Sequence, residues 1–218
     1  MPPTDWFRTT DWGEAAERDF RQRLARARPY NQIQYRRIKA VTLLDTGDPA
    51  KATAGQRLLI EILESPEAPE FEKVMALSIL GERALREGRL DEAEANLREA
   101  LRIAGQDGSG TSGLEEVWLA QVALARGNRA GLREARALVE RRAADPHPFL
   151  NARFETCLTA AKVALALGEP AAAAGWARDA LALADADHSG LANHPRLGLV
   201  QLTSQTRAWL SDVANGPR

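Results

Sequence analysis

The residues best suited to metal chemistry are two aspartates and two histidines near the C-terminal end of the chain. Asp185, Asp187, His188 and His194 lie within a stretch of ten residues and could be read as a metal-binding cluster. Their spacing matches no structural zinc site, and such sites usually include cysteine as well. We therefore interpret them as the polar loop between two helices, and we predict no metal and no cofactor.

Cys157 is the only cysteine, so an intrachain disulfide is excluded. It falls inside a helical pattern, and no histidine or basic residue is placed to lower its pKa, so we predict a buried and unreactive thiol. Two acidic pairs, Asp91-Glu92 and Glu115-Glu116, fall where helices should begin, and there they favour the positive end of the helix dipole. No catalytic residue is therefore predicted, and an enzyme has no positive sequence feature.

The basic stretch 18–39 is the strongest local concentration of charge. It contains eight basic residues and a single acid, Asp19. One interpretation is a patch for nucleic acid or an acidic protein. The other is a solvated helix face that is balanced in space by acids such as Glu61 and Glu64. The residues of the candidate patch are Arg18, Arg21, Arg23, Arg26, Arg28, Arg36 and Lys39, with Arg37 in the same stretch.

The whole chain shows no such bias. Its 218 residues carry a net charge of −1, with 27% charged and 44% hydrophobic residues, as is ordinary for a globular protein. The start of the sequence lacks a basic segment followed by an apolar run, and no window reaches 18 apolar residues. We therefore expect a cytoplasmic protein that does not interact with membranes.

Four glycines divide the chain at a regular interval. Gly47, Gly88, Gly127 and Gly168 each follow a helical pattern, and their spacings are 41, 39 and 41 residues. Glycine is the usual left-handed terminator of a helix. A fixed period near 40 residues is typical of a solenoid of stacked helix pairs.

The segment 74–107 shows the repeat most clearly. It contains two amphipathic helical patterns joined at Gly88, with small residues where two helices must touch. It resembles a tetratricopeptide repeat (TPR), the 34-residue helix–turn–helix unit. The resemblance rests on the Leu80-Gly81 pair and on the small, large and small residues Ala93, Leu97 and Ala100. Ala84 and Gly105 depart from the family pattern, which has Tyr and Pro there.

The resemblance implies an all-α fold, a right-handed α-solenoid of about four TPR-like helix pairs with an extra N-terminal helix and a C-terminal capping helix. We place the repeats at residues 33–66, 74–107, 113–146 and 154–187, and the cap at 196–214, within one domain of residues 11–214. Residues 1–10 would be a strap or disordered, and residues 215–218 a tail. Asp11 and Glu14 would form a capping box for the first helix. HEAT-like pairs are the alternative fold, because they suit a period near 40.

The resemblance also implies where a partner would bind, since the first helices of stacked TPR pairs line a concave surface. We call the residues at the family's surface positions the groove candidates. They are Gln34, Arg37, Val41, Met75, Ser78, Glu82, Arg86, Val117, Gln121, Glu155 and Lys162. We therefore expect a non-catalytic scaffold or adaptor that binds a peptide or a partner helix. Nucleic-acid binding through the stretch 18–39 is the alternative, and the partner and the oligomeric state are left open.

Overall fold

The computed structural model describes residues 5–105, 110–190 and 192–216. Within these ranges the chain forms ten α-helices and one short 3₁₀ helix, and it contains no strand. The all-α prediction is therefore confirmed for the described residues. The predicted repeat 74–107 and the predicted tail 215–218 each run partly outside them.

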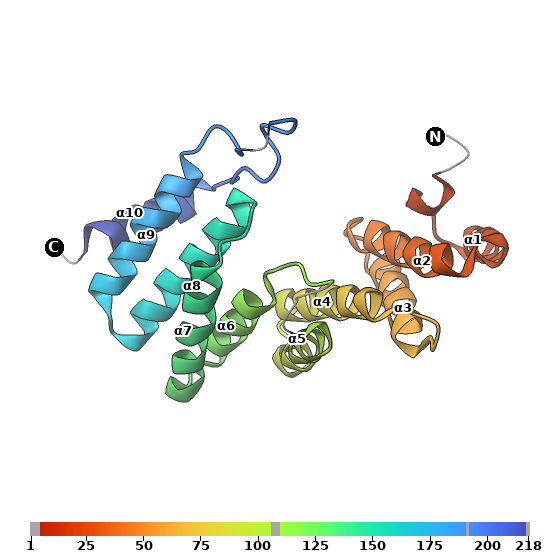
Figure 1. Cartoon of the computed structure of the whole chain (residues 1–218), viewed down its shortest axis with the longest axis horizontal. Coiled ribbons are helices and arrows are strands. Elements are labelled where there is room, and N and C mark those ends of the chain that lie inside the picture. Colours follow the sequence, from red (N-terminus) through yellow and green to blue (C-terminus); the bar gives the residue numbers. More distant parts are fainter. Residues whose placement is uncertain (1–4, 106–109, 191, 217–218) are drawn as a thin grey trace. The chain divides into compact units, whose positions relative to one another are not determined.

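The helices divide into two compact units, which are described separately. The first unit comprises Met1–Arg83 and Arg98–Ser112, and the second comprises Ala84–Leu97 and Gly113–Arg218. The division falls inside helices α4 and α5. The helices up to α5 are η1 (Trp6–Arg8), α1 (Glu14–Arg26), α2 (Pro29–Leu44), α3 (Pro49–Glu64), α4 (Glu70–Arg86) and α5 (Leu90–Ala104), as labelled in Figure 1.

Five further helices follow in the second unit, and consecutive members lie side by side (Figure 1). They are α6 (Glu115–Arg126), α7 (Arg129–Ala144), α8 (Leu150–Leu167), α9 (Pro170–Ala184) and α10 (Ser204–Asn215). In this unit α6 packs against both α7 and α8, while α9 packs against both α8 and α10.

The four periodic glycines lie between the members of four helix pairs: α2/α3, α4/α5, α6/α7 and α8/α9. Their φ angles are 73° at Gly47, 75° at Gly88, 68° at Gly127 and 81° at Gly168. A Cβ atom added at any of the four would meet nothing within 4 Å. Glycine is therefore required there for the left-handed backbone and not for space. The prediction of these four turns is confirmed.

Second helices begin with a cap or a proline directly after three of these turns. Asp48 accepts hydrogen bonds through Oδ1 from the backbone N–H of Ala50 at 2.8 Å and of Lys51 at 3.3 Å. Asn128 caps α7 in the same way, with Gly131 as the donor at 2.8 Å. Pro49 and Pro170 occupy the first positions of α3 and α9, where a missing N–H costs nothing.

The core of the first unit is built from large side chains. Leu43 of α2 and Leu58, Leu59 and Ile62 of α3 are fully buried. The helices come close at Gly55, where an added Cβ would lie 2.7 Å from the carbonyl oxygen of Ala40. This contact fixes α2 and α3 as a tightly packed pair.

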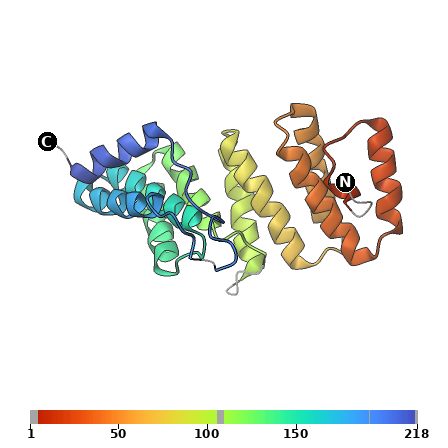
Figure 2. The same ribbon diagram turned by 90° about the horizontal axis from the view of Figure 1, so that it is seen from above.

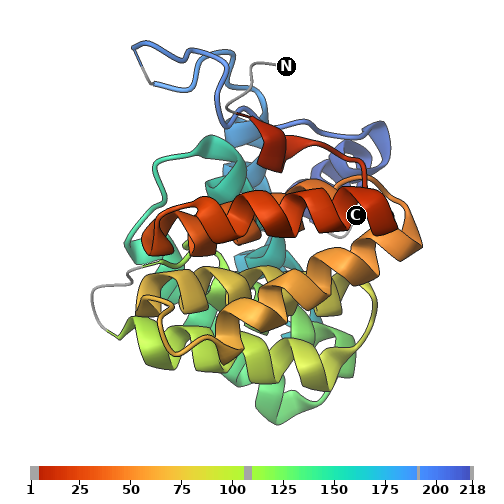
Figure 3. The ribbon, with the colours of Figure 1, turned by 90° about the vertical axis from the view of Figure 1, so that its right-hand side faces the viewer.

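An aromatic cluster attaches the N-terminal segment to the same core. Phe7 is buried and its ring stacks on that of Tyr35, with 4.2 Å between the ring centroids. The ring centroid of Trp6 lies 5.5 Å from those of both Phe20 and Tyr35. Figure 2 shows η1 next to α1 and α2, and Figure 3 shows it along one side of α1. The described part of segment 1–10 is thus a packed strap.

The second unit uses much smaller residues where its helices meet. Ala161 of α8 and Ala173, Ala177 and Ala180 of α9 are all fully buried. Leu210 of α10 packs against this alanine seam and is itself fully buried. The small residues allow α8 and α9 to approach closely, as their sequences predict.

Two predicted helix starts were wrong. Helix α1 begins at Glu14 with Gly13 as its N-cap, and no side chain caps it. The capping box fails because the carbonyl oxygen of Asp11 accepts a hydrogen bond from Lys39, which holds residues 9–12 against α2 outside any helix.

The last helix begins at Ser204 and not near residue 196. Thr203 caps it, with its Oγ1 accepting the N–H of Thr206 at 3.2 Å. The loop persists up to that cap because the carbonyl oxygen of Gly198 is bound by the N–H of Asn151 at 2.7 Å, and Gly198 has a φ of 74°. Among the described residues, no helix is both long and apolar enough to cross a membrane.

Candidate functional site

In the first unit, the predicted groove residue Arg37 is already bound to an acid of the same unit. Its Nε lies 2.6 Å from Oε2 of Glu72, and its Nη2 lies 3.5 Å from Oε1. The side chain of Glu72 is only 2% exposed and that of Arg37 is 17% exposed. Arg37 therefore connects α2 to α4 and is not free to recognise a partner in this arrangement.

Other groove candidates from α2 and α4 differ in how much surface they offer. Gln34, Val41 and Met75 are half-buried, as is Glu82, and Arg86 is exposed. Ser78, in contrast, is 3% exposed and belongs to the interior. The accessible part of the predicted surface is consequently smaller than the sequence suggests.

In the second unit, two predicted groove residues bind each other. Oε1 of Glu155 accepts hydrogen bonds from Nε1 of Trp118 and from Nε2 of Gln121, both at 3.2 Å. Gln121 also donates to Oγ1 of Thr159 at 3.1 Å. The network joins α6 to α8 and fixes the orientation of both first helices.

The other two groove candidates of α6 and α8 have opposite environments. Val117 is fully buried and offers no surface. Lys162 is exposed, and its Nζ lies 6.0 Å from the centroid of the Trp209 ring. Lys162 is therefore the groove candidate of α8 that can reach a partner.

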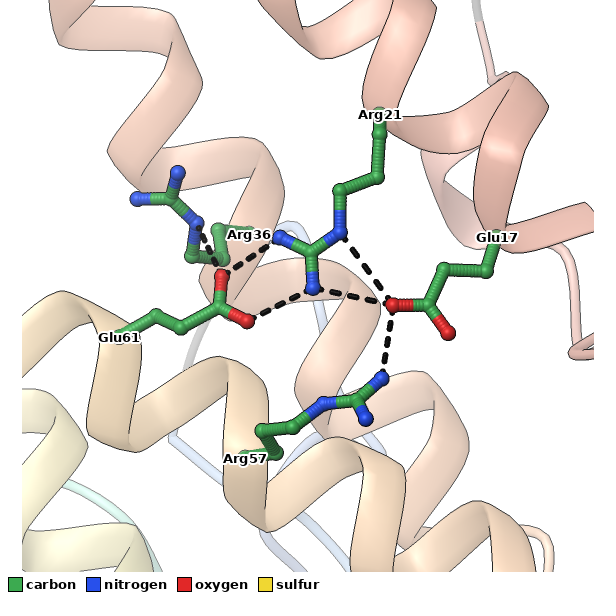
Figure 4. Close-up of polar contacts among 5 residues, drawn as sticks. All are labelled: Glu17, Arg21, Arg36, Arg57 and Glu61. Atoms are coloured by element: carbon green, nitrogen blue, oxygen red, sulfur yellow. Dashed lines mark hydrogen bonds and ion pairs between the residues drawn. The ribbon is translucent and has the colours of Figure 1, made fainter. Parts of the chain in front are cut away.

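The basic stretch is largely neutralised by acids of the same unit, as Figure 4 shows for five residues. Arg21 donates to Glu17 at 3.1 Å and to both carboxylate oxygens of Glu61 at 2.7 and 2.8 Å, and these hydrogen bonds raise its pKa. Arg57 donates to the same oxygen of Glu17 at 2.7 Å. Arg36 adds an ion pair of 3.3 Å to Glu61, while burial lowers the pKa of its guanidinium.

Two further arginines of the patch pair along α1 itself. Arg18 binds Glu14 at 2.6 Å and Arg23 binds Asp19 at 3.0 Å, each one turn away. Glu61 is one of the balancing acids expected from the sequence. The basic residues counted along the sequence therefore overestimate the positive potential that a polyanion would meet at this surface.

Lys39 does not belong to a surface patch, because it is 2% exposed. Its Nζ donates to the carbonyl oxygens of Thr9 and Asp11 at 2.5 and 3.0 Å and to Oγ1 of Thr9 at 2.9 Å. The ammonium also lies 5.3 Å from the Trp12 ring and 5.9 Å from the Phe20 ring. Burial lowers its pKa. Lys39 anchors the N-terminal strap to α2.

A pocket of about 410 Å³ opens in the second unit between α7, α8 and α9. Its lining combines charged, polar and apolar groups from the three helices and from the turn before α8. The lining residues are Arg142, Ala143, Pro146, His147, Arg153, Thr156, Cys157, Trp176, Asp179, Ala182 and Leu183. None of the predicted groove residues belongs to this lining.

Cys157 lies in the wall of this pocket as a protonated thiol. It is 9% exposed, and burial, together with the charge of Asp179, raises its pKa to about 11. The predicted burial of the thiol is confirmed. Within the described ranges, no group of three or more His, Cys, Asp or Glu residues could hold a metal ion.

Sequence reasoning missed this pocket because its charged residues are spread over more than thirty positions. Arg142, Arg153 and Asp179 come from three different helices, and no short motif connects them. Only the pairing of helices at a regular period could have indicated that α7, α8 and α9 would be neighbours.

Comparison with known proteins adds no family to this description. No family model matches the chain, and no curated protein or solved structure matches it either.

Proposed function

We propose that the chain is a TPR-like helical-repeat scaffold that acts without catalysis in the cytoplasm and binds a peptide or a partner helix. In this proposal the four helix pairs form a right-handed α-solenoid with an extra N-terminal helix and the capping helix α10. The first helices of the pairs would line the binding surface. HEAT-like pairs remain the alternative arrangement.

One observation carries the proposal. Each of the pairs α2/α3, α4/α5, α6/α7 and α8/α9 is joined by a short turn with a left-handed glycine, and these turns recur every 39 to 41 residues. A buried alanine lies five residues after the turn glycine in three of the second helices, at Ala52, Ala93 and Ala173, and about one turn later in α7, at Ala135. Stacked pairs of this kind expose long helical faces, which is how repeat proteins bind other chains.

The contacts of the groove candidates divide them into two roles. Arg37, Gln121 and Glu155 hold first helices in place through the hydrogen bonds described above. Lys162 and Arg86 are exposed, and Gln34, Val41 and Met75 are half-buried, so these residues would contact the partner. Apolar contacts would supply affinity and the charges would supply specificity.

The test is affinity capture from the native host with quantitative mass spectrometry. The variant Gln34→Glu/Lys162→Glu changes accessible first-helix residues and leaves the internal network intact. Arg133→Glu is the matched control, because Arg133 is exposed on α7, the second helix of its pair. Thermal melts of all three proteins establish that they are equally folded.

We expect a partner that is captured by the native chain and by Arg133→Glu and is lost from the double variant. Reconstitution of the purified pair would then establish a direct interaction. Equal capture by the double variant, or no protein enriched above empty resin, contradicts binding through the first helices.

Nucleic-acid binding through residues 18–39 is not the function that we propose. Arg21 and Arg36 share Glu61, Arg18 and Arg23 pair along α1, and Lys39 is buried. Binding of generic DNA or RNA that weakens steeply with salt would reverse this choice.

A further inference from the structure

The pocket between α7, α8 and α9 carries opposite charges on two of its walls. Arg153 comes from α8 and Asp179 from α9, and both side chains are exposed. Within the described part of the chain, neither forms an ion pair with the other or with any third residue. Both act on the thiol of Cys157, where Arg153 lowers the pKa and Asp179 raises it. The two charges therefore line the same pocket without neutralising each other by contact.

The guanidinium of Arg142 adds positive charge to the lining of the pocket. Arg142 pairs through Nη2 with Asp145 at 3.2 Å, but the Asp145 side chain is 90% exposed, so water weakens this pair. Nε of Arg142 is buried and has no hydrogen-bond partner among the described residues. This nitrogen is too buried to contact a ligand directly, so Arg142 contributes to the pocket through its positive charge.

Besides the polar residues His147, Thr156 and Cys157, the rest of the lining is apolar. Trp176 and Leu183 of α9 form one wall together with Ala182, and Pro146 and Ala143 extend the surface toward α7. The volume of about 410 Å³ lies in the range of pockets for small molecules. A ligand that fits must therefore carry an anionic group, a cationic group and an apolar body.

We propose that this pocket binds a small zwitterion of the α-amino-acid type with a large apolar side chain. Its carboxylate would lie against the guanidinium of Arg153, its ammonium against the carboxylate of Asp179, and its side chain against Trp176 and Leu183. The site is separate from the predicted partner surface, so this proposal does not depend on the proposed scaffold function.

The experiment compares three probes by isothermal titration calorimetry on the full chain. L-phenylalanine carries both charges, N-acetyl-L-phenylalanine carries only the carboxylate, and L-phenylalaninamide carries only the ammonium. We expect saturable binding of L-phenylalanine with a Kd of about 1 mM or tighter. Each blocked probe should bind about tenfold or more weakly, because it leaves one charged group of the pocket unpaired.

Two variants assign each charge to its partner. Asp179→Asn should abolish the preference for L-phenylalanine over its N-acetyl form and keep the preference over the amide. Arg153→Gln should do the reverse. Arg178→Gln is the matched control, because Arg178 is exposed on α9 next to Asp179 and does not line the pocket.

The single cysteine provides a second readout. Cys157 lies in the pocket wall, so L-phenylalanine should slow its alkylation by N-ethylmaleimide in native protein. The proposal is overturned if no probe binds saturably at millimolar concentration. It is also overturned if both preferences persist in the two variants or if ligand leaves the alkylation rate unchanged.

Discussion

The first unit fills its seams with large aliphatic and aromatic side chains, whereas the α8/α9 seam of the second unit is filled mainly by alanine. Leu58, Leu59 and Ile62 of α3 are fully buried, and Phe7 and Phe20 extend this core toward the strap. In α9 the fully buried residues are Ala173, Ala177 and Ala180.

The charges of the first unit and those of the pocket in the second unit also differ in burial. The first unit contains a buried acid, Glu72, that is paired with Arg37, and a buried ammonium, Lys39, that is held by backbone carbonyls. The pocket of the second unit has a buried neutral thiol, while its charges at Arg153 and Asp179 are exposed. The buried charges of Glu72 and Lys39 therefore serve internal structure, whereas the charges of Arg153 and Asp179 stay exposed at the pocket, where a ligand could meet them.

We expect the largest effect from Glu72→Ala. This change leaves the partly buried guanidinium of Arg37 without its partner, which should cost about 3–5 kcal/mol of unfolding free energy. Chemical denaturation followed by circular dichroism measures it. Asp19→Ala is the control, because its pair with Arg23 is exposed and should contribute about 0–1 kcal/mol. Equal losses in the two variants would contradict an internal role for the Arg37–Glu72 pair.

Leu59→Ala should have the next largest effect. Leu59 is fully buried in the first unit, and its truncation removes apolar contacts and leaves a cavity, for about 2–5 kcal/mol. Ile60→Ala on the same helix is the control, because Ile60 is 45% exposed. The same denaturation series should show a clear difference, and its absence would mean that α3 does not face the core as described.

Ala177→Leu tests the alanine seam between α8 and α9 by adding side-chain volume instead of removing it. Ala177 is fully buried among Cys157, Ala161 and Leu210, so a larger side chain should force α8 and α9 apart. We expect a loss of about 1–3 kcal/mol from overpacking. Ala182→Leu in the pocket wall should cost much less, because Ala182 is exposed. A silent Ala177→Leu variant would show that the seam is looser than its burial indicates.

The smallest effect should appear only at alkaline pH. The folded pKa of Cys157 is about 11 against an ordinary value of 9.0, so the folded state retains a proton that the unfolded state loses. The stability of the native chain relative to Cys157→Ala should therefore fall as pH rises from about 9 to about 11, by on the order of 1–2 kcal/mol. Thermal melts of both proteins at matched pH measure the difference.

Lys39 should change the stability of each protein with pH in the opposite direction. Its lowered folded pKa means that the unfolded state binds more protons, so its contribution to stability rises as pH approaches 10.5. The comparison of native chain and Cys157→Ala cancels this contribution, because Lys39 is present in both proteins. A difference that stays constant with pH would show that Cys157 titrates normally in the folded chain.

How far the fold could be predicted varies along the chain. The turns at Gly47, Gly88, Gly127 and Gly168 could be predicted because a left-handed helix end is a local requirement on one residue. The start of α1 could not, because Lys39, far away in the sequence, binds the carbonyl of Asp11. The start of α10 could not be predicted for the same kind of reason, because the N–H of Asn151 binds the carbonyl oxygen of Gly198.

The candidate surfaces were less predictable than the helices. The resemblance to a tetratricopeptide repeat predicted Arg37, Val117 and Glu155 as partner-binding residues. In the structure Arg37 and Glu155 form internal hydrogen bonds, and Val117 is fully buried. Exposure depends on which neighbouring helix covers a position, and the repeat pattern does not specify that for each side chain.

The sequence by itself determined that this protein consists of helices paired at a period near 40 residues. Apolar periodicity, proline and glycine act within one or two turns of chain, so this information is local. Only the tertiary structure decided which charges neutralise one another and which remain in a pocket. Glu61 meets Arg21 across forty positions, and Arg153 and Asp179 share a pocket without pairing, because such contacts depend on how distant helices pack.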